Sequence, residues 1–90
     1  MSISMTELAR AREIVGGLLD ELRLDAYVFE VEPGDDGWDV RVECAVAEGW
    51  ETCRLRAPKA SLLGAADEAA ARRRLLDDWA EVLSACLRNV

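Results

Sequence analysis

The sequence contains no histidine and a single lysine, Lys59, and these two shortages exclude most catalytic machinery. Without histidine, a serine or cysteine nucleophile lacks its usual general base. The three cysteines, Cys44, Cys53 and Cys86, are odd in number and lack CxxC spacing, which argues against a disulfide framework and against a zinc site. We therefore predict that the chain is not an enzyme and that it holds no cofactor and no metal.

Long hydrophobic runs and a basic leader are missing as well. No window approaches 18 consecutive apolar residues, which excludes a membrane-spanning helix. Residues 1–7 are polar and their first charge is acidic, so no secretory signal is expected. Together with the cysteine pattern, these features predict a protein of the reducing cytoplasm.

The length and composition predict one small domain. The chain has 90 residues, of which 51% are hydrophobic and 32% are charged. Area scaling at this size gives about 64% of the unfolded surface buried on folding, enough for one modest core. A two-domain enzyme and a wholly disordered chain are both excluded, and residues 1–90 are predicted to form a single domain.

The N-terminal part of the chain has the pattern of an amphipathic helix. Apolar residues recur at helical spacing over residues 5–22, after a capping box formed by Ser4 and Glu7. Gly16 and Gly17 interrupt this helix at a cost of about 1 kcal/mol each relative to alanine. We expect them to mark either close internal packing or a contact surface.

Three stretches of alternating residues follow and predict an antiparallel meander. Apolar and polar residues alternate over 27–32, 38–47 and 50–56. The turn 33–37 joins the first two strands, and Glu48–Gly49 is expected to form a two-residue connection to the third. The alternation gives the sheet one apolar face, which we expect the helices to cover, and one solvated polar face.

The registers predicted for the two hairpins place the same side chains of the middle strand on this apolar face. In the first hairpin Val31 lies opposite Val40, and Glu30 lies opposite Arg41 on the polar face.

In the second hairpin Cys44 lies opposite Cys53, and Glu43 lies opposite Arg54. The two facing cysteines are interpreted as small core residues, with a strained disulfide acting as a redox switch as the alternative. Cys86 is likewise expected in the core.

The C-terminal third predicts a second helix. Pro58 favours a helix start, residues 59–64 are expected to form a short turn, and Asp67 is expected to cap a long final helix. Glu68 and Arg72 have the spacing of a favourable ion pair within that helix. Its apolar stripe consists of Leu75, Leu76, Trp79, Val82, Leu83, Cys86, Leu87 and Val90.

The predicted fold class is therefore α+β: a two-layer helix, three-stranded antiparallel β-meander, helix arrangement (α-β-β-β-α) with both helices on one sheet face. This element order is similar to that of the double-stranded RNA-binding domain. The family is basic at the start of its last helix, whereas residues 65–71 here contain Asp67 and Glu68. Direct binding of RNA is therefore not expected.

The net charge of −7 is concentrated in the first half of the chain. Residues 20–43 carry nine acids against Arg23 and Arg41. Such a surface repels nucleic acid and anionic lipid and attracts basic proteins. Ordinary solubility charge is the alternative explanation, so the charge alone does not decide the matter.

Three tryptophans are unusual beside one phenylalanine and one tyrosine. Trp79 is expected in the core, whereas Trp38 at a turn and Trp50 on the polar sheet face are candidate interface anchors, with packing against strand ends as the alternative. The residues predicted to contact a partner are Glu30, Glu32, Asp35, Asp36, Trp38, Asp39 and Trp50.

Two functional hypotheses follow. The first is a non-catalytic, small acidic protein-binding module, in its extreme form a nucleic-acid mimic that inhibits a partner by occupying its basic surface, as phage anti-defence proteins do. The alternative is a homodimeric accessory or chaperone-like protein of a bacterial cytoplasm. This alternative is suggested because the chain has more apolar residues than one thin layer would bury, including Ile14, Val28 and Val90.

Overall fold

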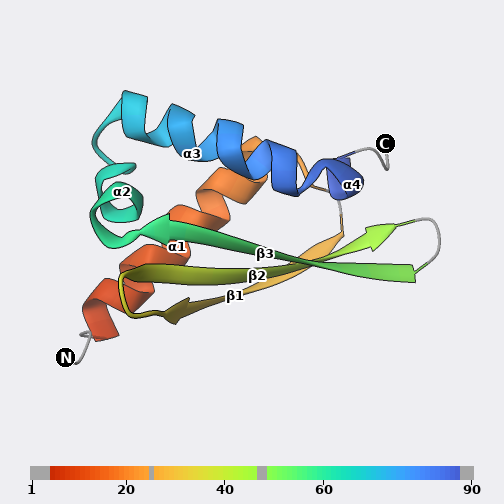
Figure 1. Ribbon diagram of the computed structural model, residues 1–90, viewed down its shortest axis with the longest axis horizontal. Helices are drawn as coiled ribbons and strands as arrows, with labels where there is room; N and C mark the ends of the chain where they lie inside the picture. Colours follow the sequence, from red (N-terminus) through yellow and green to blue (C-terminus); the bar gives the residue numbers. More distant parts are fainter. Residues whose placement is uncertain (1–4, 25, 47–48, 88–90) are drawn as a thin grey trace.

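The computed structural model describes residues 5–24, 26–46 and 49–87, which form a two-layer α+β domain (Figure 1). The predicted order of a helix, three strands and C-terminal helices is confirmed. The elements are α1 (Met5–Glu21), β1 (Tyr27–Pro33), β2 (Gly37–Val46), β3 (Gly49–Pro58), α2 (Lys59–Gly64), α3 (Ala69–Val82) and α4 (Ser84–Leu87).

The three strands form one antiparallel sheet in the order β1-β2-β3, and the helices pack on one of its faces (Figure 1). α1 lies against β1, α3 against β3 and α4 against β2. The core between the layers consists of alternate strand residues and the apolar sides of α1, α2 and α3. Val15, Leu18 and Leu19 of α1 are fully buried there, each contributing about 1.5–3 kcal/mol.

Gly16 in α1 lies beside the Phe29 ring of β1. A Cβ at this position would lie 3.6 Å from the Phe29 ring on β1, which is ordinary van der Waals contact. An alanine would therefore fit at this position, so the packing does not require glycine. The proposed capping residue of this helix, Ser4, lies outside the described residues.

The register predicted for the first hairpin is confirmed. Val31 lies opposite Val40, and Glu30 lies opposite Arg41, with its carboxylate 2.6 Å from the guanidinium. The hydrogen bond from Gly34 N–H to the Gly37 carbonyl closes the turn at 2.8 Å. The hydrophobic pattern and the short turn together determined this pairing.

The register predicted for the second hairpin is wrong by two residues. Val46 lies opposite Gly49, so Cys53 faces Val42 rather than Cys44, and Arg54 faces Arg41. A slip of two residues leaves every side chain on the same face, so the alternating pattern could not distinguish the two registers.

A glycine at the far end of the hairpin suits the observed register. Gly37 lies opposite Pro58, and a Cβ on Gly37 would overlap the carbonyl oxygen of Ala57. Only glycine allows β2 and β3 to approach this closely at that end.

The C-terminal region differs from the predicted single helix. Residues 59–64 form the short helix α2, and Glu68 rather than Asp67 precedes α3, with no side-chain cap. Helix α3 ends at Val82, and the non-helical Leu83 (φ −90°, ψ 14°) separates it from α4.

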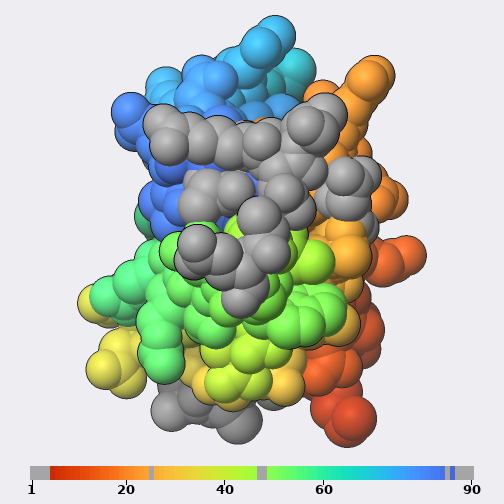
Figure 2. Space-filling view, turned by 90° about the vertical axis from the view of Figure 1, so that its right-hand side faces the viewer, coloured from red at the N-terminus to blue at the C-terminus, as the bar shows by residue number. Residues whose placement is uncertain are grey.

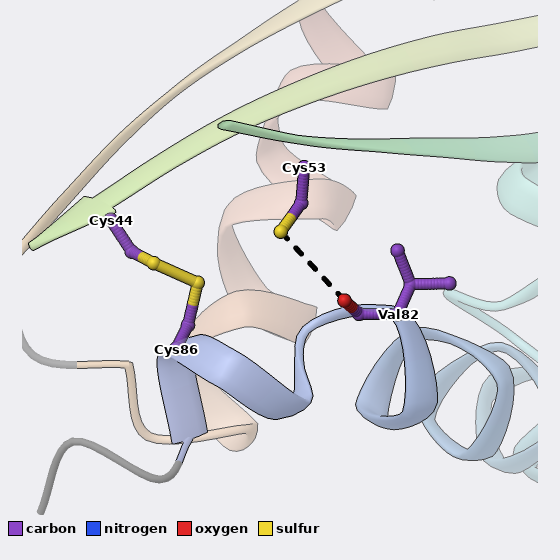
Figure 3. The surroundings of a disulfide bond; sticks show 4 residues. All are labelled: Cys44, Cys53, Val82 and Cys86. Atoms are coloured by element: carbon purple, nitrogen blue, oxygen red, sulfur yellow. Dashed lines mark hydrogen bonds between the residues drawn. A yellow bond between two sulfur atoms is a disulfide. The ribbon is translucent and has the colours of Figure 1, made fainter. Parts of the chain in front are cut away.

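This break brings Cys86 to the sheet, where it forms a disulfide with Cys44 (Figure 3). The two Cα atoms are 5.9 Å apart, and Cys53 is the free cysteine. The expectation that the cysteines do not form a disulfide was therefore wrong, because the partner of Cys44 comes from α4, 42 residues away in sequence. The disulfide also removes the cysteine argument for a reducing compartment.

Candidate protein-binding site

The face of the sheet opposite the helices carries most of the predicted contact residues, and we call it the open face. None of the helices in the described part of the chain packs on it, and most of its side chains are exposed. Strand periodicity places alternate residues there. The open face consists of Val28, Glu30, Glu32, Asp39, Arg41, Glu43, Ala45, Trp50, Thr52, Arg54 and Arg56.

Charge on the open face is sorted by strand. β1 contributes the acids Glu30 and Glu32, whereas β3 contributes the arginines Arg54 and Arg56. These two rows flank a mixed row on β2, and a shallow depression of about 340 Å³ lies over the charged residues. The face is therefore divided into an acidic side and a basic side and is not uniformly acidic.

Two ion pairs cross the strands on this face. Arg41 contacts Glu30 at 2.6 Å, as predicted, and Arg56 contacts Asp39 at 3.0 Å. The predicted pair of Glu43 with Arg54 does not form, because the register places Glu43 opposite Thr52. Both observed pairs are exposed, so each contributes about 0.2–1 kcal/mol and exchanges readily for an external partner.

Carboxylates without an ion-pair partner among the described residues lie at the end of β1 and in the turn between β1 and β2. Glu32, Asp35 and Asp36 are exposed, and no described residue forms an ion pair with them. We call these three residues, together with Glu30 and Asp39, the acidic hairpin. All five predicted carboxylates thus lie on one continuous piece of chain.

The three tryptophans have different environments. Trp50 is 64% exposed on the open face, consistent with its predicted position, and Trp79 is buried in the core as expected. Trp38 is only 1% exposed, so its proposed part as a surface anchor is incompatible with this fold. Trp38 lies on the same face of β2 as Val40 and Val42, and this parity carries it into the core despite its place beside a turn.

The apolar residues suggested for a dimer interface also have different environments. Ile14 is 8% exposed and belongs to the core, whereas Val28 is 56% exposed on the open face. Val90 lies outside the described residues. Val82, which was placed on the apolar stripe of the final helix, is 48% exposed, because α3 ends at this residue and the chain turns.

Arg72 links two helices rather than pairing with Glu68. Its Nη2 and Nε atoms lie 2.6 Å and 2.8 Å from one carboxylate oxygen of Glu21 at the end of α1. Sequence spacing within one helix could not predict this contact, which depends on how α3 crosses α1.

The pKa values of two side chains, Tyr27 and Cys53, are raised in the folded protein. Partial burial, followed by the hydrogen bond to Asp20 at 3.1 Å and the negative charge of that residue, raises the pKa of Tyr27. Partial burial and the nearby charge of Glu51 raise the pKa of the Cys53 thiol. A raised pKa lowers the thiolate population at neutral pH, so Cys53 lacks the environment of a reactive nucleophile.

Comparisons with protein-family models, with curated proteins and with solved structures found no match. None of the described helices is long and apolar enough to cross a membrane. The charged side chains of the described residues all retain solvent exposure.

Proposed function

We propose that the chain is a small, non-catalytic protein-binding module whose acidic hairpin engages a basic surface of a partner protein. One observation carries this proposal: five exposed carboxylates lie on one hairpin, and the described part of the chain supplies ion-pair partners only to Glu30 and Asp39. Complementary charge accelerates association and selects among partners.

The position of the arginines defines how a partner would approach. Arg54 and Arg56 on β3 repel a basic surface, so its cations are expected over β1 and the turn. Glu30 and Asp39 can exchange their own arginines for those of the partner at small cost, because exposed ion pairs are weak. A nucleic-acid-binding protein offers such a surface, and occupation of that surface would inhibit it.

A titration with an oligo-arginine peptide tests the location of the site. We expect the backbone amide signals of residues 30–39 in ¹⁵N-labelled protein to shift first, and the affinity to fall between 20 mM and 200 mM salt because exposed charges are screened. Shifts spread evenly over all acidic residues would contradict a localised site.

Two triple charge reversals provide a matched comparison. Glu32→Lys, Asp35→Lys and Asp36→Lys change the hairpin, whereas Asp77→Lys, Asp78→Lys and Glu81→Lys change exposed positions of α3. Each set moves the net charge from −7 to −1, since each reversal adds two units. We expect the hairpin set to weaken peptide binding about tenfold and the helix set to weaken it about twofold, in line with about 0.2–1 kcal/mol for each exposed pair. Equal losses would show that net charge alone governs binding.

A further inference from the structure

The registers of the two hairpins align charged side chains in rows across the open face. Glu30 lies opposite Arg41, and Arg41 lies opposite Arg54. The next row along the strands consists of Glu32, Asp39 and Arg56. Each row runs from a carboxylate on β1 to a guanidinium on β3, about 10 Å apart, since neighbouring strands are about 4.8 Å apart. Figure 2 shows side chains of the sheet (yellow to green) projecting on the flank opposite α1 (red to orange).

Arg54 differs from the other two arginines of these rows in its partners. Arg41 contacts Glu30 at 2.6 Å, and Arg56 contacts Asp39 at 3.0 Å. Arg54 is exposed, and in the described part of the chain no ion pair or side-chain hydrogen bond involves it. Its guanidinium is therefore available to an external anionic group.

Arg41 and Arg54 lie at a close cross-strand position. The hydrogen bond from Ala45 N–H to the Ala26 carbonyl, at 2.9 Å, shows that odd-numbered residues of β2 bond to β1. The backbone of Arg41 therefore does not bond to Arg54, and at such sites the Cα atoms approach to about 4.5 Å. Like charges directly opposite each other destabilise a sheet. Glu30 offsets this repulsion through its contact with Arg41.

A cation bound over β1 removes that compensation. When a basic group of the partner takes the Glu30 carboxylate, Arg41 loses its ion pair beside Arg54. The same exchange at Asp39 releases Arg56, which is two residues from Arg54 and about 7 Å away along the strand. All three arginines line the depression on the open face. A carboxylate placed among them would offset the repulsion, because guanidinium groups bind carboxylates through charge-assisted hydrogen bonds.

We propose that the open face binds a dipolar surface of the partner, which places a basic group over Glu30 on β1 and a carboxylate over Arg54 on β3. This inference rests on the proposed function, because it defines the chemistry of the same partner. The order of the charges on the partner then contributes to its selection as well as their sign. Binding of the basic group and binding of the carboxylate favour each other, since the first releases Arg41 beside Arg54.

Short end-capped peptides test this chemistry. In acetyl-Arg-Pro-Pro-Glu-amide the polyproline helix has three residues per turn and a rise of about 3.1 Å, so the two charged side chains share one side about 9 Å apart. Acetyl-Arg-Pro-Pro-Gln-amide lacks the carboxylate, and acetyl-Arg-Pro-Glu-Pro-amide has the same composition with the wrong spacing. In ¹⁵N-labelled protein at about 20 mM salt we expect the glutamate peptide to shift residues 30, 41 and 54 and to bind about threefold more tightly than either control peptide.

Two single substitutions provide a matched comparison. Arg54→Gln changes the open face, whereas Arg73→Gln changes an exposed position of α3. Each removes one positive charge and moves the net charge from −7 to −8. Arg54→Gln should cancel the preference for the glutamate peptide and bind the oligo-arginine peptide at least as tightly as the wild type, because a repulsive charge is removed. Arg73→Gln should keep the threefold preference.

Three outcomes would overturn the inference: absence of binding by the glutamate peptide, equal affinity for the glutamate peptide and a control peptide, or a preference that survives Arg54→Gln. None of them contradicts the acidic hairpin while the oligo-arginine peptide still shifts residues 30–39. Loss of those shifts is the separate result that contradicts the proposed function.

Discussion

The disulfide between Cys44 and Cys86 fastens the C-terminal helix α4 to the central strand, and its removal is expected to lower the free energy of unfolding substantially. The sequence separation of 42 residues sets the size of the effect. In the chain-entropy description, a closed loop of this length restricts the unfolded chain by about 13 cal/mol/K, which corresponds to about 4 kcal/mol at 25 °C. Small domains have a total stability of about 5–15 kcal/mol, so the reduced protein should be marginally stable.

Urea unfolding followed by tryptophan fluorescence measures this change. Trp38 and Trp79 are both buried, so their emission reports the loss of the core. At a denaturant slope of about 1–2 kcal/mol/M, a loss of about 4 kcal/mol lowers the midpoint by about 2–4 M on reduction. Cys44→Ala with Cys86→Ala should reproduce the shift in the absence of reductant.

Cys53→Ser is the control, because it removes a thiol and leaves the disulfide intact. This variant should move the midpoint by less than about 1 M, and its response to reductant should match that of the wild type. Identical midpoints for oxidised and reduced wild-type protein would refute the reasoning that loop closure through α4 stabilises the fold.

Two further changes test the packing and the titration of named residues. Gly37→Ala should destabilise the fold by about 2 kcal/mol or more in thermal unfolding, because the new Cβ overlaps the carbonyl oxygen of Ala57, whereas Gly64→Ala, with no atom within 4 Å of the new Cβ, should be neutral or slightly stabilising. Equal effects of the two alanines would contradict the close approach. The pKa of Tyr27 is raised above its usual 10.0 in the folded protein, so its contribution to stability is present below that pH and is lost as the pH rises through the folded pKa. Urea unfolding between pH 8 and pH 11 should therefore show a steeper loss for the wild type than for Tyr27→Phe, and parallel curves would exclude the shift.

Most of the candidate site was predictable because it depends on local periodicity. Alternation placed Glu30, Glu32 and Asp39 on the polar face, and a short turn held Asp35 and Asp36 in place. The same alternation put Trp38 among core residues, and only its place beside a turn suggested exposure.

Sequence periodicity by itself determined the element order, the two faces of the sheet and the pairing of Glu30 with Arg41, because these features arise between residues close in the chain. The tertiary structure decided the register of the second hairpin, since a slip of two residues preserves both faces. It also decided the partner of Cys44 and the break at Leu83 that brings Cys86 to β2. Those contacts join segments far apart in sequence, so they exist only after the helices have packed on the sheet.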